Sequence, residues 1–451
     1  MYGNNITLLD FLVLPIVLLF VYAIAYRYRN RHYPGSHPYR KYFIPGLTFK
    51  ILGAIFIGFV YEYYYRGGDT MNYFFHAKVI NSSFADSPVK WLNLLLQLPH
   101  ETSVGYYQYI SQMYWYSDPS SYTVGAIAAF LGLFTGTTYL PTAVLFAALS
   151  FTGAWALFRT FATVYPSLVK PIAIAALFIP SVIVWGSGIF KDTICMFALG
   201  WFTYGVFQVL VQRNLRIANL FFTVLSLYLL YLVKVYILIA FLPALVLWVL
   251  FTYTAVIRGR GLRIFVKFFV FIIAVTASAT VFMNLGEEEL GRYSFSEIEQ
   301  TAETTREWIQ YSSGDEGSAY DLGDTGSGVG MLWKIPAAVN VTLFRPYVWE
   351  ARKVLVFFNA LEALLFLFLT LRVLFAVGVG RVWSTIMQDA NLQFFLVFTV
   401  IFAAAVGLTS GNFGTLSRYK IPCLPFFAMA LVIIYYKNRP LSQKLLKPLG
   451  L

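Results

Sequence analysis

Long apolar runs alternate along this chain with short polar loops. A run of about 20 apolar residues has the length of a helix that crosses a lipid bilayer. The alternation therefore predicts an all-α, polytopic membrane protein in which about 11 transmembrane helices form one bundle over residues 1–451. The expected spans are 7–26, 47–61, 138–158, 171–186, 193–211, 217–232, 236–257, 264–284, 354–371, 391–408 and 421–436.

One apolar run does not fit the alternation, and two long segments remain on the predicted outer side. The apolar run 122–135 is short for a crossing, so we expect a re-entrant or interfacial helix there. With the apolar and Tyr-rich stretches before it, this run makes 62–136 a predicted region of extracytoplasmic or interfacial helices. The segment 286–353 is rich in Asp and Glu around a Gly/Ser-rich middle, and it is predicted to be an acidic extracytoplasmic loop.

Composition supports a membrane protein. The chain is 59% hydrophobic and 12% charged, with a mean hydropathy of +0.67. The net charge of +12 does not indicate nucleic-acid binding, because most basic residues lie in short loops between apolar runs. Both cysteines, Cys195 and Cys423, fall within apolar runs and are expected to be small core residues.

The loops that carry basic residues predict the orientation in the membrane. They are 27–41, 159–170, 213–216, 258–267, 372–381 and 437–447, and the one acid near them is Asp389. By the positive-inside rule these loops are cytoplasmic. The N-terminus is then expected outside and the C-terminus in the cytoplasm.

The first candidate motif, residues 66–73, directly follows the second expected span. Its two glycines allow a tight turn, after which Asp69 or Thr70 suits the N-cap of a helix. On that helix His76 falls near the same face as Asp69. The carboxylate could serve as a general base at the membrane surface, or the motif could be only a helix cap with an Arg66–Asp69 ion pair.

The second motif, residues 180–192, joins two expected spans through a Gly-Ser-Gly turn. Free backbone N–H groups at a helix N-terminus favour anions, and Lys191 adds a positive charge. The alternative is a Lys191–Asp192 pair that only anchors the interface.

The third motif, residues 343–353, leads back to the membrane after the acidic loop. Arg345, Glu350 and Arg352 bracket aromatic residues; a guanidinium matches phosphate oxygens and aromatic rings stack on sugars. An ordinary aromatic and basic interface anchor is the alternative. Glu362, deeper in the next span, must be paired with a cation or kept neutral.

The fourth motif, residues 410–420, places a Gly-rich turn before Arg418 and Lys420. It could equally be a loop with interface anchors. Lys234, between two apolar runs, is a weaker candidate that could be a snorkelling lysine.

These motifs share one property: their cations lie on the predicted outer side, where the positive-inside rule does not explain them. Together they could hold a membrane-anchored diphosphate while a carboxylate deprotonates a sugar hydroxyl. The predicted phosphate-binding or substrate-binding residues are Arg66, Lys191, Arg345, Glu350, Arg352, Arg418 and Lys420, and the candidate catalytic residues are Asp69 and then Asp192.

The four motifs resemble those of bacterial polytopic proteins of cell-surface polysaccharide assembly, of the O-antigen polymerase and EpsG type, and of GT-C glycosyltransferases. The similar stretches are Gly-Gly-Asp-Thr at 67–70, Ser-Gly-Ile-Phe-Lys-Asp at 187–192, Arg-Pro-Tyr-Val-Trp-Glu at 345–350 and Ser-Arg-Tyr-Lys at 417–420.

The resemblance implies a GT-C-like fold in the bacterial inner membrane and a polyprenyl-phosphate-linked sugar donor. Asp69 would match the catalytic base of GT-C enzymes, and Arg345, Arg352 and Arg418 would match polymerase arginines that contact the lipid diphosphate. The chain departs from the pattern because its acid follows the second span and its long loop is acidic.

The predicted function is therefore a membrane glycosyltransferase or polysaccharide polymerase of the cell envelope. It would act at the outer leaflet on a polyprenyl-(di)phosphate-linked saccharide, with membrane lipid but no nucleic acid as a partner. Two alternatives stay open: a transporter or flippase of the lipid-linked glycan, and a non-catalytic envelope subunit that docks a partner through the acidic loop. No metal cofactor is expected from the four scattered histidines, although carboxylates could hold Mg²⁺.

Overall fold

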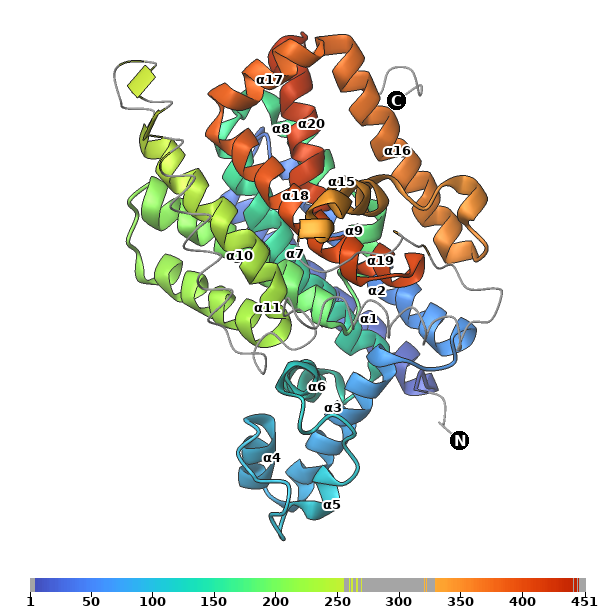
Figure 1. The fold of residues 1–451 in the computed structure, drawn as a ribbon. Helices are drawn as coiled ribbons and strands as arrows, with labels where there is room; N and C mark the ends of the chain where they lie inside the picture. The colour runs from blue at the N-terminus through green and yellow to red at the C-terminus, as the bar shows by residue number, and fades with distance from the viewer. Residues whose placement is uncertain are drawn as a thin grey trace. The chain divides into compact units, whose positions relative to one another are not determined.

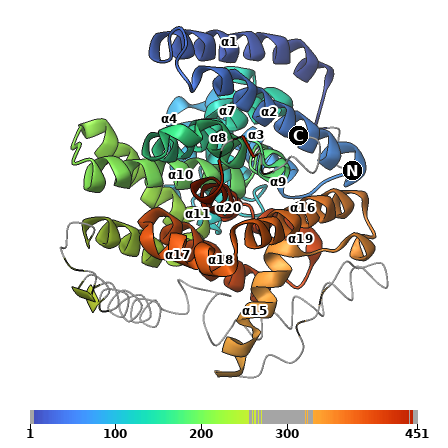
Figure 2. The same ribbon diagram turned by 90° about the horizontal axis from the view of Figure 1, so that it is seen from above.

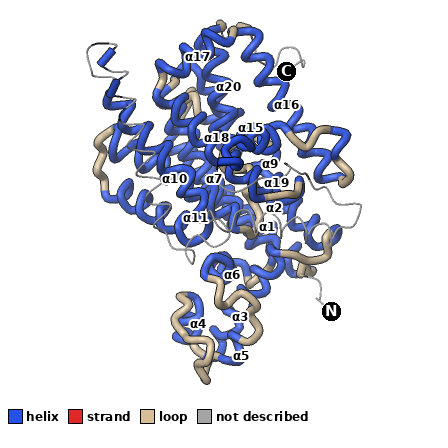
Figure 3. The backbone as a smooth tube through the Cα atoms, in the orientation of Figure 1, coloured by secondary structure: helices blue, strands red, loops and turns tan. Residues whose placement is uncertain are grey.

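The computed structural model describes residues 5–254 and 329–440, with Tyr320, Leu322 and scattered positions in 259–269 and 442–445. Across these residues the chain is helical and contains no β-strand (Figure 3). The all-α prediction is therefore confirmed for the described part of the chain. Most of the expected span 264–284 and most of the predicted acidic loop lie outside the described residues.

Seven helices in the described part are long and apolar enough to cross a membrane, or eight if one bent pair counts as a span. The chain is thus a multi-pass membrane protein by the length and composition of its helices. The candidate spans are α1 (Leu8–His32), α2 (Arg40–Phe59) with the π turn η1 (Val60–Tyr64), α7 (Tyr139–Val164), α10 (Lys191–Val206) with η4 (Phe207–Val211), α11 (Ile217–Thr254), α16 (Val354–Val377) and α18 (Ala390–Thr409). The bent pair is α19 (Phe413–Tyr419) and α20 (Leu424–Asn438), at 69°.

The expected count of 11 spans is not confirmed. After the 3-10 turn η3 (Pro166–Leu168), the run 171–186 is divided between two short helices, α8 (Val169–Leu177) and α9 (Pro180–Trp185). Pro180 explains the break, because proline lacks an N–H and disfavours helical geometry in the preceding residue. The two spans expected at 217–232 and 236–257 correspond to two helices joined in α11 by a kink, where Lys234 has non-helical angles (φ −151°, ψ 78°). By length and composition α11 counts once among the candidate spans.

The structure divides into two compact units. Unit 1 comprises Met1–Val164, Val182–Phe207 and Leu215–Lys234; unit 2 comprises Tyr165–Ser181, Gln208–Asn214 and Val235–Leu451. In unit 1, α7 packs against α1, α2 and α10, and Figure 2 shows α1 alongside α2 and α7. Helices α7 and α10 approach closely because glycines face each other there: a Cβ added to Gly200 would lie only 1.9 Å from the carbonyl oxygen of Gly153.

The predicted region 62–136 forms the helices α3 (Asp69–Asp86), α4 (Pro88–Leu95), α5 (Tyr107–Ile110) and α6 (Pro119–Gly132), with the 3-10 turn η2 (Leu133–Thr135). Figure 1 shows them grouped at one end of unit 1. Ser87 caps α4 and Asp118 caps α6 through side-chain oxygens. The short apolar run expected at 122–135 thus forms a helix shorter than any candidate span.

Unit 2 contains α8, α15 (Val329–Phe344), η7 (Val348–Glu350), α16, α17 (Val379–Gln388), α18, α19 and α20. Helix α18 packs against α15 and α20. Aromatic rings pack in the core of unit 2. The ring centroids of Phe241 and Phe398 are 4.9 Å apart, and those of Phe398 and Phe426 are 5.0 Å apart. Within the predicted acidic loop 286–353, Tyr320 donates its O–H to the carbonyl of Gly407 at 2.8 Å.

Candidate functional site

The first motif forms the tight turn that its glycines predict. Arg66, Gly67 and Gly68 have φ of 56°, 143° and 118°, a backbone region that favours glycine. The turn ends η1 and α3 begins at Asp69, with Gly68 as the N-cap. The expected N-cap at Asp69 or Thr70 is therefore wrong by one position or two. Half-buried Asp69 lies instead in the first helical turn, where the helix dipole stabilises a negative charge.

His76 lies on α3 two helical turns after Asp69 and is almost completely buried. Its Nε2 accepts the backbone N–H of Trp115 at 3.4 Å, whereas its Nδ1 has no hydrogen-bond partner among the described residues. Burial lowers the pKa of His76 to about 4, so the ring is neutral at pH 7. His76 is thus a packed core residue and is poorly placed to exchange protons with Asp69.

The second motif is held by a lysine that the sequence analysis missed. Lys50, buried inside α2, donates from Nζ to the carbonyls of Gly186 at 2.8 Å and Val182 at 2.9 Å, and to Ser150 Oγ at 3.3 Å. These bonds fix the Gly-Ser-Gly turn between α9 and α10. A lysine inside an apolar span was the available signal, because charged residues at that depth are expensive and need partners.

The turn positions Lys191 as the first residue of α10. Its Nζ donates to Asp118 Oδ2 at 3.4 Å, and the two side chains are 19% and 43% exposed. The charges of Asp69 and Lys234 also interact electrostatically with Lys191. Burial acts to raise the pKa of Asp118, but the hydrogen bond from Ser121 and the charge of Lys191 outweigh it, so that pKa is lowered and the carboxylate is ionised.

The neighbouring residue, Asp192, has a different partner. Its Oδ1 accepts a 2.6 Å hydrogen bond from Lys234 Nζ, and the two side chains are only 1% and 8% exposed. Lys234 stands at the break in α11, and Ser120 Oγ donates to the adjacent Val233 carbonyl at 2.7 Å. In place of the Lys191–Asp192 pair that was the alternative interpretation, each residue pairs with a different partner at the start of α10. We call Asp118, Lys191, Asp192 and Lys234 the lysine–aspartate cluster.

In unit 2 the third and fourth motifs meet. Arg345 donates to both carboxylate oxygens of Glu350 and lies over the ring of Phe413, 5.2 Å from its centroid. The hydrogen bond to Glu350 raises the pKa of Arg345. Burial acts to raise the pKa of Glu350, but the bonds from Arg345 and from the Tyr347 backbone keep it below its usual value. Glu350 is thus the partner of Arg345 rather than a separate ligand group.

Glu362 is buried in α16 and accepts the Ser181 backbone N–H at 2.8 Å, at the start of α9. Its Oε1 has no hydrogen-bond partner among the described residues. The buried Lys420 lies near enough for the opposite charges to interact. Lys420 of the fourth motif is therefore a cation whose charge acts on Glu362, without a hydrogen bond between the two side chains. Arg352 is exposed, and Arg418 is half-buried.

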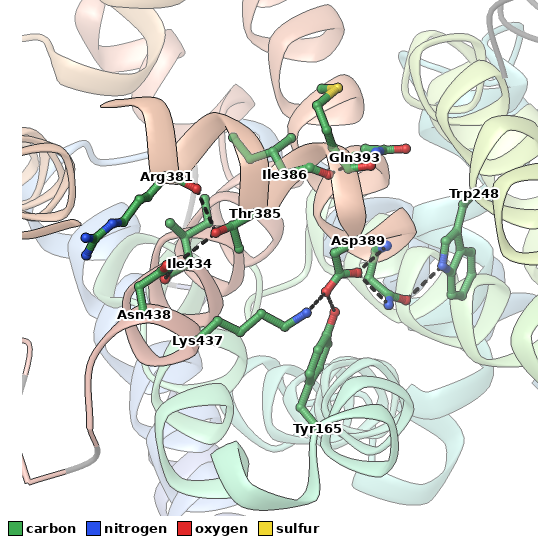
Figure 4. Close-up of polar contacts among 12 residues, drawn as sticks. Tyr165, Trp248, Arg381, Thr385, Ile386, Asp389, Gln393, Ile434, Lys437 and Asn438 are labelled. Carbon is green, nitrogen blue, oxygen red and sulfur yellow. Dashed lines mark hydrogen bonds and ion pairs between the residues drawn. The ribbon is translucent and has the colours of Figure 1, made fainter. Parts of the chain in front are cut away.

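A further polar cluster of unit 2 surrounds Asp389, the N-cap of α18 (Figure 4). Asp389 accepts hydrogen bonds from Lys437 of α20 and from the Tyr165 hydroxyl, the latter at 2.7 Å. Burial acts to raise the pKa of Asp389, but the bonds from Lys437 and Tyr165 outweigh it and lower that pKa. Burial and the Asp389 charge raise the pKa of Tyr165. This cluster ties three helix ends together.

The candidate residues are thus divided between the units. Unit 1 contains Arg66, Asp69, Lys191 and Asp192, and unit 2 contains Arg345, Glu350, Arg352, Arg418 and Lys420. That all of them share one site stays a prediction. In the described part of the chain, no three His, Cys, Asp or Glu side chains are grouped to hold a metal ion.

Comparison of the chain with protein-family models, with curated proteins and with solved structures finds no match. The class that the structure defines is therefore the broad one, a helical multi-pass membrane protein with paired charges at the ends of its helices.

Proposed function

We propose that this protein is a membrane glycosyltransferase or polysaccharide polymerase whose donor is a polyprenyl-phosphate-linked saccharide. The observation that carries the proposal is the position of Lys191. It starts a candidate span, is partly open to solvent and is faced by Asp118 and by the charge of Asp69. A cation beside carboxylates at this place combines phosphate binding with base catalysis.

In the proposed mechanism Asp69 is the general base. Its half-buried position in the first turn of α3, after a strained turn, leaves the carboxylate within reach of a ligand. Asp69 would take the proton of the acceptor hydroxyl as the sugar carbon is attacked, and Lys191 would stabilise the negative charge that develops on the departing phosphate. Asp192 fits the base role less well, because it is buried and bonded to Lys234.

Asp118 enters the proposal as the acid that holds Lys191 in place. A phosphate that binds Lys191 would compete with Asp118, whose side chain is 43% exposed and able to move away. The phosphate-binding candidates of unit 2 remain Arg345, Arg352, Arg418 and Lys420. The proposal also includes a GT-C-like fold and a location in the inner membrane, with the N-terminus outside and the C-terminus in the cytoplasm.

One observation favours a second candidate, a non-catalytic envelope subunit. Lys191, Lys234 and Arg345 all have carboxylate partners inside the chain, so their charges are balanced without a ligand. In that case the pairs would serve only the fold.

The test separates the two. The full chain in lipid nanodiscs would be given polyprenyl-phosphate- and polyprenyl-diphosphate-linked saccharides, and transfer would be followed by chromatography and mass spectrometry. Asp69→Asn should abolish transfer but retain lipid-phosphate binding, and Lys191→Gln should weaken that binding. Asp86→Asn, at the other end of α3, is the matched control and should keep both. A fully active Asp69→Asn variant would refute the base assignment, and wild-type protein that neither binds nor transfers would favour the subunit.

A further inference from the structure

The end of α1, the loop after it and the start of α2 line an open pocket of about 360 Å³ in unit 1. Arg29, Arg40 and Lys41 line it together with His37 and Pro45. Its lining contains no carboxylate, and the sequence has no acid at all between Asp10 and Glu62. The pocket is therefore cationic, which sets it apart from the paired charges of the lysine–aspartate cluster.

The two arginines of the pocket converge on one neutral oxygen. Nη2 of Arg29 and Nη2 of Arg40 each donate to Asn30 Oδ1 at 2.9 Å. Arg40 is fixed further by its Nη1, which donates to the Tyr33 carbonyl at 2.8 Å. Two guanidinium groups that share one acceptor atom repel each other, and a neutral amide oxygen does not cancel that repulsion. An anion bound in the pocket would cancel it, and the planar guanidinium suits phosphate oxygens in particular.

Helix geometry adds to the positive potential. Arg40 is the first residue of the 20-residue helix α2, so the positive end of that helix dipole lies at the pocket. Lys41 is exposed and lies over the Tyr42 ring, 5.2 Å from its centroid. Its ammonium is thus available to a ligand from solvent.

An exposed apolar stripe continues from the pocket along α2. Lys41 and Pro45 line the pocket, and Phe49, Leu52 and Phe56 follow them at intervals of three and four residues, on one helix face. These three side chains are 47%, 54% and 46% exposed. A stripe of this kind in a candidate span is suited to contact acyl chains, which a free phosphate ion does not have.

We propose that this pocket binds the phosphate headgroup of an anionic phospholipid, with an acyl chain along the Phe49–Phe56 stripe. Basic pockets beside transmembrane helices recognise such headgroups through the same charge complementarity. The site is distinct from the proposed transferase site and does not depend on that function.

The experiment counts lipids retained by the full chain in native mass spectrometry, after exchange into phosphatidylglycerol or phosphatidylcholine of identical acyl chains. Wild type should retain phosphatidylglycerol selectively, and Lys41→Gln should reduce that retention about fivefold, the effect of one basic residue near an anionic headgroup. Arg31→Gln is the matched control, because it removes one exposed charge from the last turn of α1, outside the pocket lining, and should retain as much lipid as wild type.

Arg29→Gln should also reduce the retention of phosphatidylglycerol. Lys41→Gln is the decisive variant, because the Lys41 side chain is exposed and its replacement leaves the fold intact. Equal retention of both lipids by wild type, or equal losses in Lys41→Gln and Arg31→Gln, would overturn the proposal. A parallel titration with inorganic phosphate tests the other source of this chemistry: phosphate that displaces phosphatidylglycerol at millimolar concentration would assign the pocket to a free anion instead.

Discussion

Removal of the carboxylate of Asp192 should destabilise the protein strongly. In Asp192→Asn the ammonium of Lys234 loses the negative charge that faces it at 2.6 Å, while its side chain stays only 8% exposed. A buried charge deprived of its partner typically costs about 3–5 kcal/mol. At roughly 2–4 °C per kcal/mol for a folded body of this size, the melting temperature should fall by about 10 °C.

The double variant Asp192→Asn/Lys234→Met gives the test its specificity. Replacement of both partners of a buried pair by neutral side chains is often nearly neutral for stability. The double variant should therefore recover most of the lost melting temperature. Asp118→Asn is the control, because the Lys191–Asp118 pair is longer, at 3.4 Å, and more exposed, so its loss should cost about 1 kcal/mol or less.

The assay is thermal unfolding of each purified full-length variant in one detergent, followed by intrinsic fluorescence and by the loss of the monodisperse chromatographic peak. A melting temperature of Asp192→Asn equal to that of wild type would refute the argument that the pair is buried and charged. A double variant no more stable than the single one would show that Lys234 is held by other contacts.

Three further outcomes are expected. Folded His76 has a pKa of about 4, whereas an unfolded histidine has one near 6.5, so the stability that comes from burying the neutral ring is complete above about pH 6.5 and is lost as the pH falls toward 4. In melts at pH 5 the wild type should have lost about 2 kcal/mol of its free energy of unfolding, and His76→Gln should not show this loss. Asp389 has a lowered pKa, so Asp389→Asn should reduce stability by about 1–3 kcal/mol at pH 7, and this difference from wild type should shrink in melts below the pKa of an unfolded aspartate, about 3.9. Gly200→Ala should cost about 1–3 kcal/mol because its Cβ would meet α7, whereas Gly105→Ala, with no heavy atom within 4 Å, should melt like wild type.

Much of the local structure was predictable because its causes are local. Apolar runs, glycine turns and proline breaks act within a few residues, so the tight turn before Asp69 and the helix at 122–135 follow from the chain itself. The boundary errors have local causes too. Pro180 divides an apolar run that was expected to be one span, and the cap at Gly68 lies one or two residues before the predicted position.

The partners of the charged residues could not be predicted in this way. Asp118 gave no signal in the sequence, since its importance comes from Lys191, 73 residues further along the chain. Lys191 and Asp192 are adjacent, but a helix directs consecutive side chains about 100° apart, so each found a different partner.

What the sequence by itself determined is a helical protein of the membrane, with its breaks, turns and cationic loops, because burial of apolar surface and backbone hydrogen bonding in lipid act on every run separately. What only the tertiary structure decided is which charged side chains have polar partners inside the chain. Buried Lys234 pairs with Asp192, and Lys50 donates to the Gly186 carbonyl, while the pocket of Arg29 and Arg40 has no carboxylate in its lining. That outcome depends on contacts between segments far apart in the chain, and it separates the charges that stabilise the fold from those that can bind a ligand.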